Sequence, residues 1–198
     1  MYVGVARIFK RYWNTYGGFS ALRVSFYLHV AVALLVLTVN TWIAPTCLVG
    51  SSCNAWWDQS LSILPNLLGF TLGGFAIFIG FGDEKFKNQL AAPEHDPSKP
   101  TIYLSLCATF VHFITVQVLA LVVAIVAKSW WFYASWMDPL RDVLPWLNAF
   151  AGAVGYGLFL YALTSVLAAT MHVFRIATMY EAHQRYQVKK DSAANDGK

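Results

Sequence analysis

The sequence predicts an all-α fold, an integral membrane four-helix bundle, from its composition and from four long apolar stretches. Of the 198 residues, 58% are hydrophobic and only 12% are charged, whereas about a quarter of the residues in a soluble domain are charged. Each stretch reaches the ~20 residues that a helix needs to cross ~30 Å of hydrocarbon, and none contains Asp, Glu, Lys or Arg. The four predicted spans cover about 25–44, 61–81, 102–127 and 144–173.

The distribution of Lys and Arg predicts how the chain is oriented. Twelve of the fourteen precede the first span, follow the fourth, or lie between the second and third spans. Lys128 and Arg141 are the two exceptions, and the loop between the first two spans has none. Because cytoplasmic loops retain Lys and Arg, we expect a multi-pass protein of the bacterial inner (plasma) membrane with both termini in the cytoplasm.

The spans divide the chain into three parts. Residues 1–24 form a segment at the cytoplasmic face, residues 25–175 form the transmembrane domain, and residues 176–198 form a cytoplasmic tail. The last helix is expected to continue into this tail to about Val188 and to fray over 191–198. The net charge of +4 is spread over the cytoplasmic segments, which argues against nucleic acid as a partner and for anionic lipid.

Residues 2–16 predict an amphipathic helix that lies on the membrane. Aromatic side chains recur at helical spacing on one face and basic side chains take the other face, which suits the headgroup region. The alternative is a helix that packs on a partner protein through the same aromatic face. On the membrane interpretation, the residues in contact with lipid headgroups are Arg7, Lys10 and Arg11.

Small residues mark the expected helix–helix contacts. Lipid provides no hydrophobic drive between helices, so close backbone approach matters more than in water. Gly69 and Gly73 form a small-x-x-x-small motif, which would serve either within one chain or between copies in an oligomer. The glycines predicted to pack are Gly69, Gly73, Gly74, Gly152, Gly155 and Gly157.

A few polar residues interrupt the predicted spans. His112 is the one ionisable side chain expected near the middle of the bilayer, and Gln117 follows it on the same span. An intramembrane ionisable group is a functional hypothesis by default, and the alternative is a neutral His bonded to a Thr or Asn. Asn66 and Asn148 begin the second and fourth spans, where they would bond each other, cap helix ends or line a vestibule.

Tryptophan and cysteine gather in the predicted outer loops. Trp prefers the membrane interface, so the outer Trp residues, Trp56 and Trp57 among them, are expected to mark the outer boundary. Cys47 and Cys53 share one outer loop and would form a disulfide in an oxidising compartment; the alternative is two free thiols. The sequence has no metal-ligand spacing and no catalytic motif, so we expect no cofactor, no metal and no enzymatic activity.

One segment resembles a known group of proteins. The stretch from Leu64 to Phe78, followed by Gly82-Asp83-Glu84-Lys85-Phe86, resembles a block in small four-span proteins of proteobacterial inner membranes, and no activity comes with that resemblance. In size and span count the chain is also similar to the membrane component of the Kiwa anti-phage system. That similarity of architecture implies antiviral defence as a context for the protein.

Together these features favour a non-enzymatic scaffold or sensor, assembled as a homo-oligomer. Three cytoplasmic segments, 1–24, 83–100 and 176–198, would form one docking surface for a cytoplasmic effector protein. The alternative is an oligomeric channel or small-solute conduit lined by the second and fourth spans.

Overall fold

The computed structural model describes residues 2–43, 55–80, 82–93, 99–130 and 143–196. Every element in these ranges is helical, as the sequence predicts. The helices, in chain order, are α1 (Tyr2–Tyr16), α2 (Gly18–Val24), α3 (Phe26–Leu37), α4 (Val39–Ile43), α5 (Trp56–Gly80), α6 (Glu84–Ala91), α7 (Ile102–Ser129) and α8 (Leu144–Asp196).

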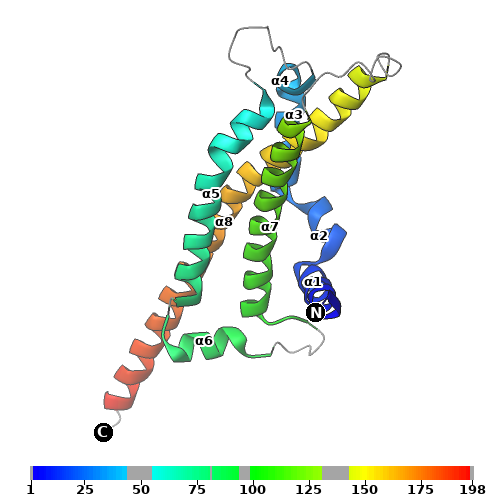
Figure 1. The fold of residues 1–198 in the computed structure, drawn as a ribbon. Coiled ribbons are helices and arrows are strands. Elements are labelled where there is room, and N and C mark those ends of the chain that lie inside the picture. The colour runs from blue at the N-terminus through cyan, green and yellow to red at the C-terminus, as the bar shows by residue number, and fades with distance from the viewer. Residues whose placement is uncertain (1, 44–54, 81, 94–98, 131–142, 197–198) are drawn as a thin grey trace.

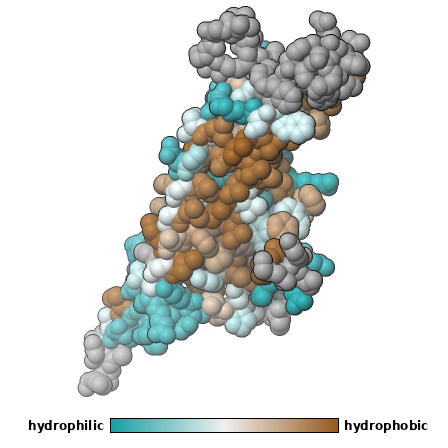
Figure 2. All heavy atoms as spheres, in the orientation of Figure 1, coloured by the Kyte–Doolittle hydropathy of each residue, from teal (hydrophilic) through white to brown (hydrophobic). Residues whose placement is uncertain are grey.

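Three described helices, α5, α7 and α8, are long and apolar enough to cross a membrane by themselves. They correspond to the second, third and fourth predicted spans. They run alongside one another in the bundle, with α5 and α7 both packed against α8 (Figure 1). The visible face carries a broad hydrophobic band between hydrophilic ends (Figure 2), as expected for a surface in contact with lipid.

The first predicted span is not one continuous helix. The structure divides the stretch 25–44 into α3 and α4, with a break at Thr38, and α2 joins α3 at a bend of 60°. The hydroxyl of Thr38 donates a hydrogen bond to the carbonyl of Leu34 at 2.6 Å, a local bond that competes with regular helix geometry. With 12 residues, α3 is about 18 Å long, so it crosses ~30 Å of hydrocarbon only together with its neighbours.

The core near the start of α5 is organised around tryptophan. Trp56 and Trp57 are 3% and 5% exposed, so their rings pack inside the bundle, and their position at the outer boundary is still a prediction. Their rings pack edge to face at 5.7 Å in a cluster that also includes Tyr156 and Val116. A Trp ring buried between helices fills volume that small residues on α8 leave free.

The glycines of α8 allow this close packing. A Cβ at Gly155 would lie 2.6 and 2.8 Å from two ring atoms of Trp56, and one at Gly152 would lie 2.5 Å from the carbonyl oxygen of Trp42. A Cβ at Gly157 would touch Leu35 at 3.4 Å. These positions bring α8 against α3, α4 and α5.

The glycines of α5 behave differently. A Cβ at Gly69 or Gly73 would meet no atom within 4 Å, and one at Gly74 would only just reach Phe110 at 4.0 Å. Among the described residues of one chain, therefore, the motif Gly69–Gly73 makes no close helix contact. Packing of this face between copies is still a prediction.

The opposite end of the bundle holds the second part of the core. The 53 residues of α8 extend for about 80 Å, which exceeds the ~30 Å of hydrocarbon that one span crosses, and the helix reaches Asp196, beyond the predicted fraying point. Asp83 caps α6 by accepting a hydrogen bond from the amide of Phe86 at 2.8 Å. Phe86 is 3% exposed and packs edge-on against Tyr180 of α8 at 5.1 Å, which places α6 across this end (Figure 1).

Candidate ligand-binding site

His112 of α7 lies at the junction of three helices. Its side chain is 3% exposed. The Nδ1 atom lies 2.8 Å from the hydroxyl of Tyr12 on α1, and the Nε2 atom lies 3.0 Å from the hydroxyl of Tyr161 on α8. Both imidazole nitrogens therefore have partners, and these are tyrosines rather than the Thr or Asn that the sequence suggested.

The aromatic face of α1 covers His112. The ring of Tyr16 stacks on the imidazole with a centroid distance of 3.9 Å and an angle of 15°, while Tyr12, one turn earlier, supplies the hydrogen bond. Gly17 and Gly18 have positive φ values of 100° and 59°, a conformation that glycine adopts without steric cost. They let the chain turn sharply between α1 and α2, so that α1 lies against α7.

This arrangement partly changes the prediction for α1. The helix forms where expected, but Tyr12, Trp13 and Tyr16 face α7 of the same chain and not the bilayer. Apolar residues on the rest of α1 stay open, with Val5 61% and Ile8 72% exposed. The placement of α1 at the membrane surface is still a prediction.

The Tyr–His–Tyr cluster is suited to uncharged side chains. A neutral imidazole has one donor and one acceptor nitrogen, which matches two hydroxyl partners, each able to donate or accept. No carboxylate occurs within the apolar stretches to compensate a charge on His112. Burial raises the pKa of Tyr12 to about 12 and also raises the pKa of Tyr16, so both phenols are protonated at neutral pH.

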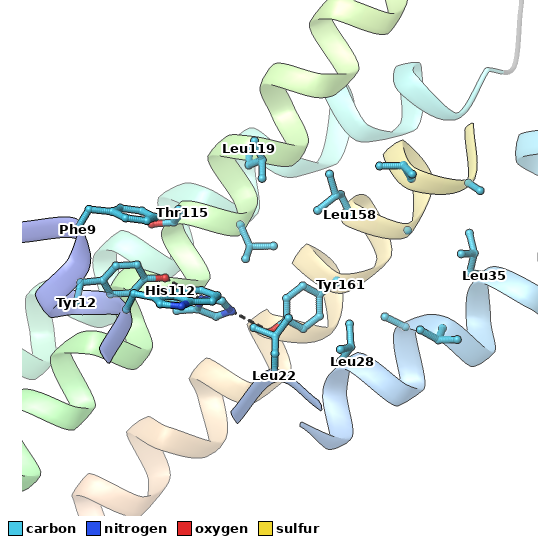
Figure 3. A pocket seen from close by; sticks show the side chains of 17 residues that line it. Phe9, Tyr12, Leu22, Leu28, Leu35, His112, Thr115, Leu119, Leu158 and Tyr161 are labelled. Carbon is cyan, nitrogen blue, oxygen red and sulfur yellow. Dashed lines mark hydrogen bonds between the residues drawn. The ribbon is translucent and has the colours of Figure 1, made fainter. Parts of the chain in front are cut away.

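An apolar cavity of about 440 Å³ lies beside the cluster. Helices α1, α2, α3, α7 and α8 all contribute to its walls (Figure 3). Leucines from four helices make the wall apolar, and His112, Tyr12, Tyr161 and Thr115 bring polar atoms to it. Ligand sites combine an apolar lining with a few oriented polar groups in this way, so the geometry fits an apolar ligand.

The other predicted polar residues do not join this cluster. Gln117 is 1% exposed and donates from Nε2 to the hydroxyl of Thr71 at 2.9 Å. Its Oε1 atom has no hydrogen-bond partner among the described residues. Asn66 and Asn148 are both exposed, so the four residues are distributed over separate places in the bundle.

The basic face of α1 lines a separate groove of about 590 Å³. Arg7, Lys10 and Arg11 form one wall, and Lys99 with Thr101, at the start of α7, forms the other. Contact of the three α1 residues with lipid headgroups is still a prediction, but the structure adds Lys99 to the same set.

The remaining sequence predictions concern cysteine and metals. Cys47 and Cys53 lie outside the described residues, and their disulfide is still a prediction. Cys107 is a free, partly buried thiol on α7. In the described ranges, no three His, Cys, Asp or Glu side chains gather as a metal site would require.

Sequence patterns identified His112 but missed its partners. Tyr12 and Tyr161 are 100 and 49 positions away from it. The one available signal was the spacing of Tyr12 and Tyr16, four residues apart on the aromatic face of α1. Nothing in the local sequence pairs Gln117 with Thr71.

The fold and this site define a class of all-helical proteins with several candidate membrane-spanning helices. The described part of the chain has three such helices, or four if the bent α2–α3 pair counts as one span. The chain matches no family model, no curated protein and no solved structure.

Proposed function

We propose that this protein is a non-enzymatic membrane sensor or scaffold that couples the bilayer to a cytoplasmic partner. The observation that carries the proposal is the docking of α1, which lies outside the long spans, onto the buried His112 of α7. The proposal gives α1 two positions, docked over the cavity as in the structure and released from it. Occupancy of the cavity would shift the balance between them.

Buried side chains connect this cavity to the C-terminal part of α8. Phe113, next to His112 in the chain, belongs to one buried cluster with Phe86 of α6 and Ile176 of α8. Phe110 and Phe113 pack edge to face at 6.5 Å. A shift of α7 would therefore also displace α6 and the extended part of α8.

The proposal places the end of the bundle that holds α6 and the C-terminal part of α8 in the cytoplasm, because most Lys and Arg lie in the segments at this end. The exposed part of α8 would hold the partner. The protein would act in the inner membrane of a bacterium, as an oligomer that uses the open Gly69–Gly73 face of α5.

The conduit alternative has less support. Thr71, a residue that would face a pore, is 1% exposed and bonded to Gln117. Asn66 and Asn148 are exposed on the surface of one chain, so they would line water only in an assembly that brings several copies together. Conductance in planar bilayers that changes on Asn66→Leu would favour this alternative.

The coupling is tested by hydrogen–deuterium exchange of the purified chain in lipid nanodiscs. His112→Leu removes both tyrosine bonds at similar volume, and we expect faster exchange in α1 together with altered exchange in α6 and in residues 176–190. The matched control is Thr109→Val on the same helix, because the Thr109 hydroxyl donates its hydrogen bond to the carbonyl of Ser105, one turn earlier on α7. Release of α1 with unchanged exchange in α6 and α8 would refute the coupling.

The partner is tested by purification from the native host in mild detergent. We expect a stoichiometric soluble protein with the full chain, and its loss on deletion of 176–198 with membrane insertion preserved. A partner that is retained after this deletion contradicts the assigned docking surface.

A further inference from the structure

We propose that the basic groove between α1 and the start of α7 is a binding site for the phosphate group of an anionic glycerophospholipid. The site consists of Arg7, Lys10 and Arg11 from α1 together with Lys99 and Thr101. It does not depend on the proposed sensor function, although both require α1 to be docked on α7.

The charges of this groove are unbalanced within the described part of the protein. Helix α1 contains no acidic residue, and the described ion pairs involve other cations: Lys128, Arg185 and His183. Arg7 and Arg11 are one turn apart, and like charges at this spacing destabilise a helix. A bound anion would remove that repulsion.

The two walls of the groove come from distant parts of the chain. Lys99 is near the start of α7, some ninety positions from α1, and it reaches the same groove only because α1 docks on α7. Thr101 caps α7, and its hydroxyl accepts a hydrogen bond from the amide of Leu104 at 3.3 Å. The positive end of the helix dipole therefore adds to the four side-chain cations.

The apolar face of α1 favours a lipid over a soluble phosphate. Val5, Ile8 and Phe9 are 61%, 72% and 55% exposed and lie on the helix that carries the three cations. A helix that carries apolar side chains on one face and Lys and Arg on the other is typical of the headgroup boundary, where the apolar groups meet acyl chains and the cations meet phosphates. A lipid with a net negative headgroup satisfies both features.

The experiment is a titration of the purified full chain in detergent, followed by native mass spectrometry. The probes are dioleoylphosphatidylglycerol, dioleoylphosphatidylcholine and glycerol 3-phosphate. We expect phosphatidylglycerol to bind at least about tenfold more tightly than phosphatidylcholine, and glycerol 3-phosphate not to compete. Equal binding of the two lipids, or full competition by glycerol 3-phosphate, would overturn the assignment to an anionic lipid.

Variants locate the site. Each cation near an anionic headgroup contributes about fivefold to binding, so Arg7→Gln with Lys10→Gln is expected to weaken phosphatidylglycerol binding by about 25-fold. The matched control, Lys189→Gln with Lys190→Gln, removes the same charge from exposed positions on α8 and should change binding less than about twofold. Equal losses in the two double variants would show non-specific attraction and refute the groove.

A variant outside α1 keeps the test valid if the first double variant releases that helix. Lys99→Gln lies on the opposite wall and is expected to weaken binding by about fivefold. Glu94 and Asp96 precede Lys99 in the chain and lie outside the described residues. If phosphatidylglycerol binds only after Glu94→Gln with Asp96→Asn, these acids occupy the groove and the proposal is wrong.

Discussion

Gly155→Ala measures how closely α8 approaches the core tryptophans. The added Cβ would lie 2.6 and 2.8 Å from ring atoms of Trp56, whereas non-bonded carbons prefer ~3.5–4.0 Å. The ring must therefore move by more than about 1 Å. It is 3% exposed and packed against Trp57, so it has little space to do so.

The size of the effect follows from two opposing contributions. Overpacking a tight core costs about 1–3 kcal/mol, and this contact falls at the upper end of that range. The better helix propensity of Ala returns at most about 1 kcal/mol. We expect a net loss of about 2 kcal/mol, which lowers the melting temperature by roughly 4–8 °C for a chain of this length.

Thermal unfolding of the purified protein in mild detergent provides the measurement. Gly69→Ala is the matched control, since its Cβ would meet no atom within 4 Å, and we expect an unchanged or slightly raised melting temperature. A Gly155→Ala protein as stable as the parent would refute the described packing of α8 on Trp56. A destabilised Gly69→Ala protein would instead support contact of this face with a second copy of the chain.

Three further predictions concern polar contacts. Thr71→Val leaves the amide of Gln117 without an acceptor and should lower the free energy of unfolding by about 1–3 kcal/mol, while adding Gln117→Met should restore most of this loss. Thermal unfolding in detergent measures both variants, and a double variant less stable than Thr71→Val would contradict the pairing. Burial raises the pKa of Tyr12 to about 12 from 10.0, so its stabilisation of docked α1 is complete below pH 10 and is lost as the pH rises through about 12. The tyrosinate absorbance of the parent should therefore show one more late-ionising group than that of Tyr12→Phe, and identical titrations would oppose the contact with His112. His183→Ala removes the hydrogen bond of 2.7 Å to Gln89. Since the bond stabilises the closed state of α6 by about 1 kcal/mol, amide exchange in α6 should become about fivefold faster. Unchanged exchange would show that this hydrogen bond does not hold α6.

Part of the candidate site was visible in the sequence because it depends on local composition. An ionisable residue in an apolar stretch is conspicuous whatever its surroundings, and this singled out His112. The aromatic and basic faces of residues 2–16 followed from helical spacing alone. The sequence did not show that Tyr12 and Tyr16 turn inward, since the same face suits a membrane surface, another protein or a neighbouring helix.

The break of the first span illustrates the same limit. Hydropathy averages over about 20 residues and treats 25–44 as one unit. The bend of 60° before α3 and the break at Thr38 depend on local hydrogen bonds, such as that from the Thr38 hydroxyl to the carbonyl of Leu34, and on the space available beside α8. Neither changes the mean hydropathy.

By itself, the sequence determined that the chain is helical and apolar enough to enter a membrane, and where three of its long helices lie. These properties sum over many residues, so no single contact can reverse them. Only the tertiary structure decided which glycines meet a neighbouring helix, that Trp56 is buried, that Gln117 pairs with Thr71, and that α1 covers His112. Each of these depends on the relative position of helices that are distant in the chain, and one side-chain pattern is compatible with several such arrangements until the whole core is packed.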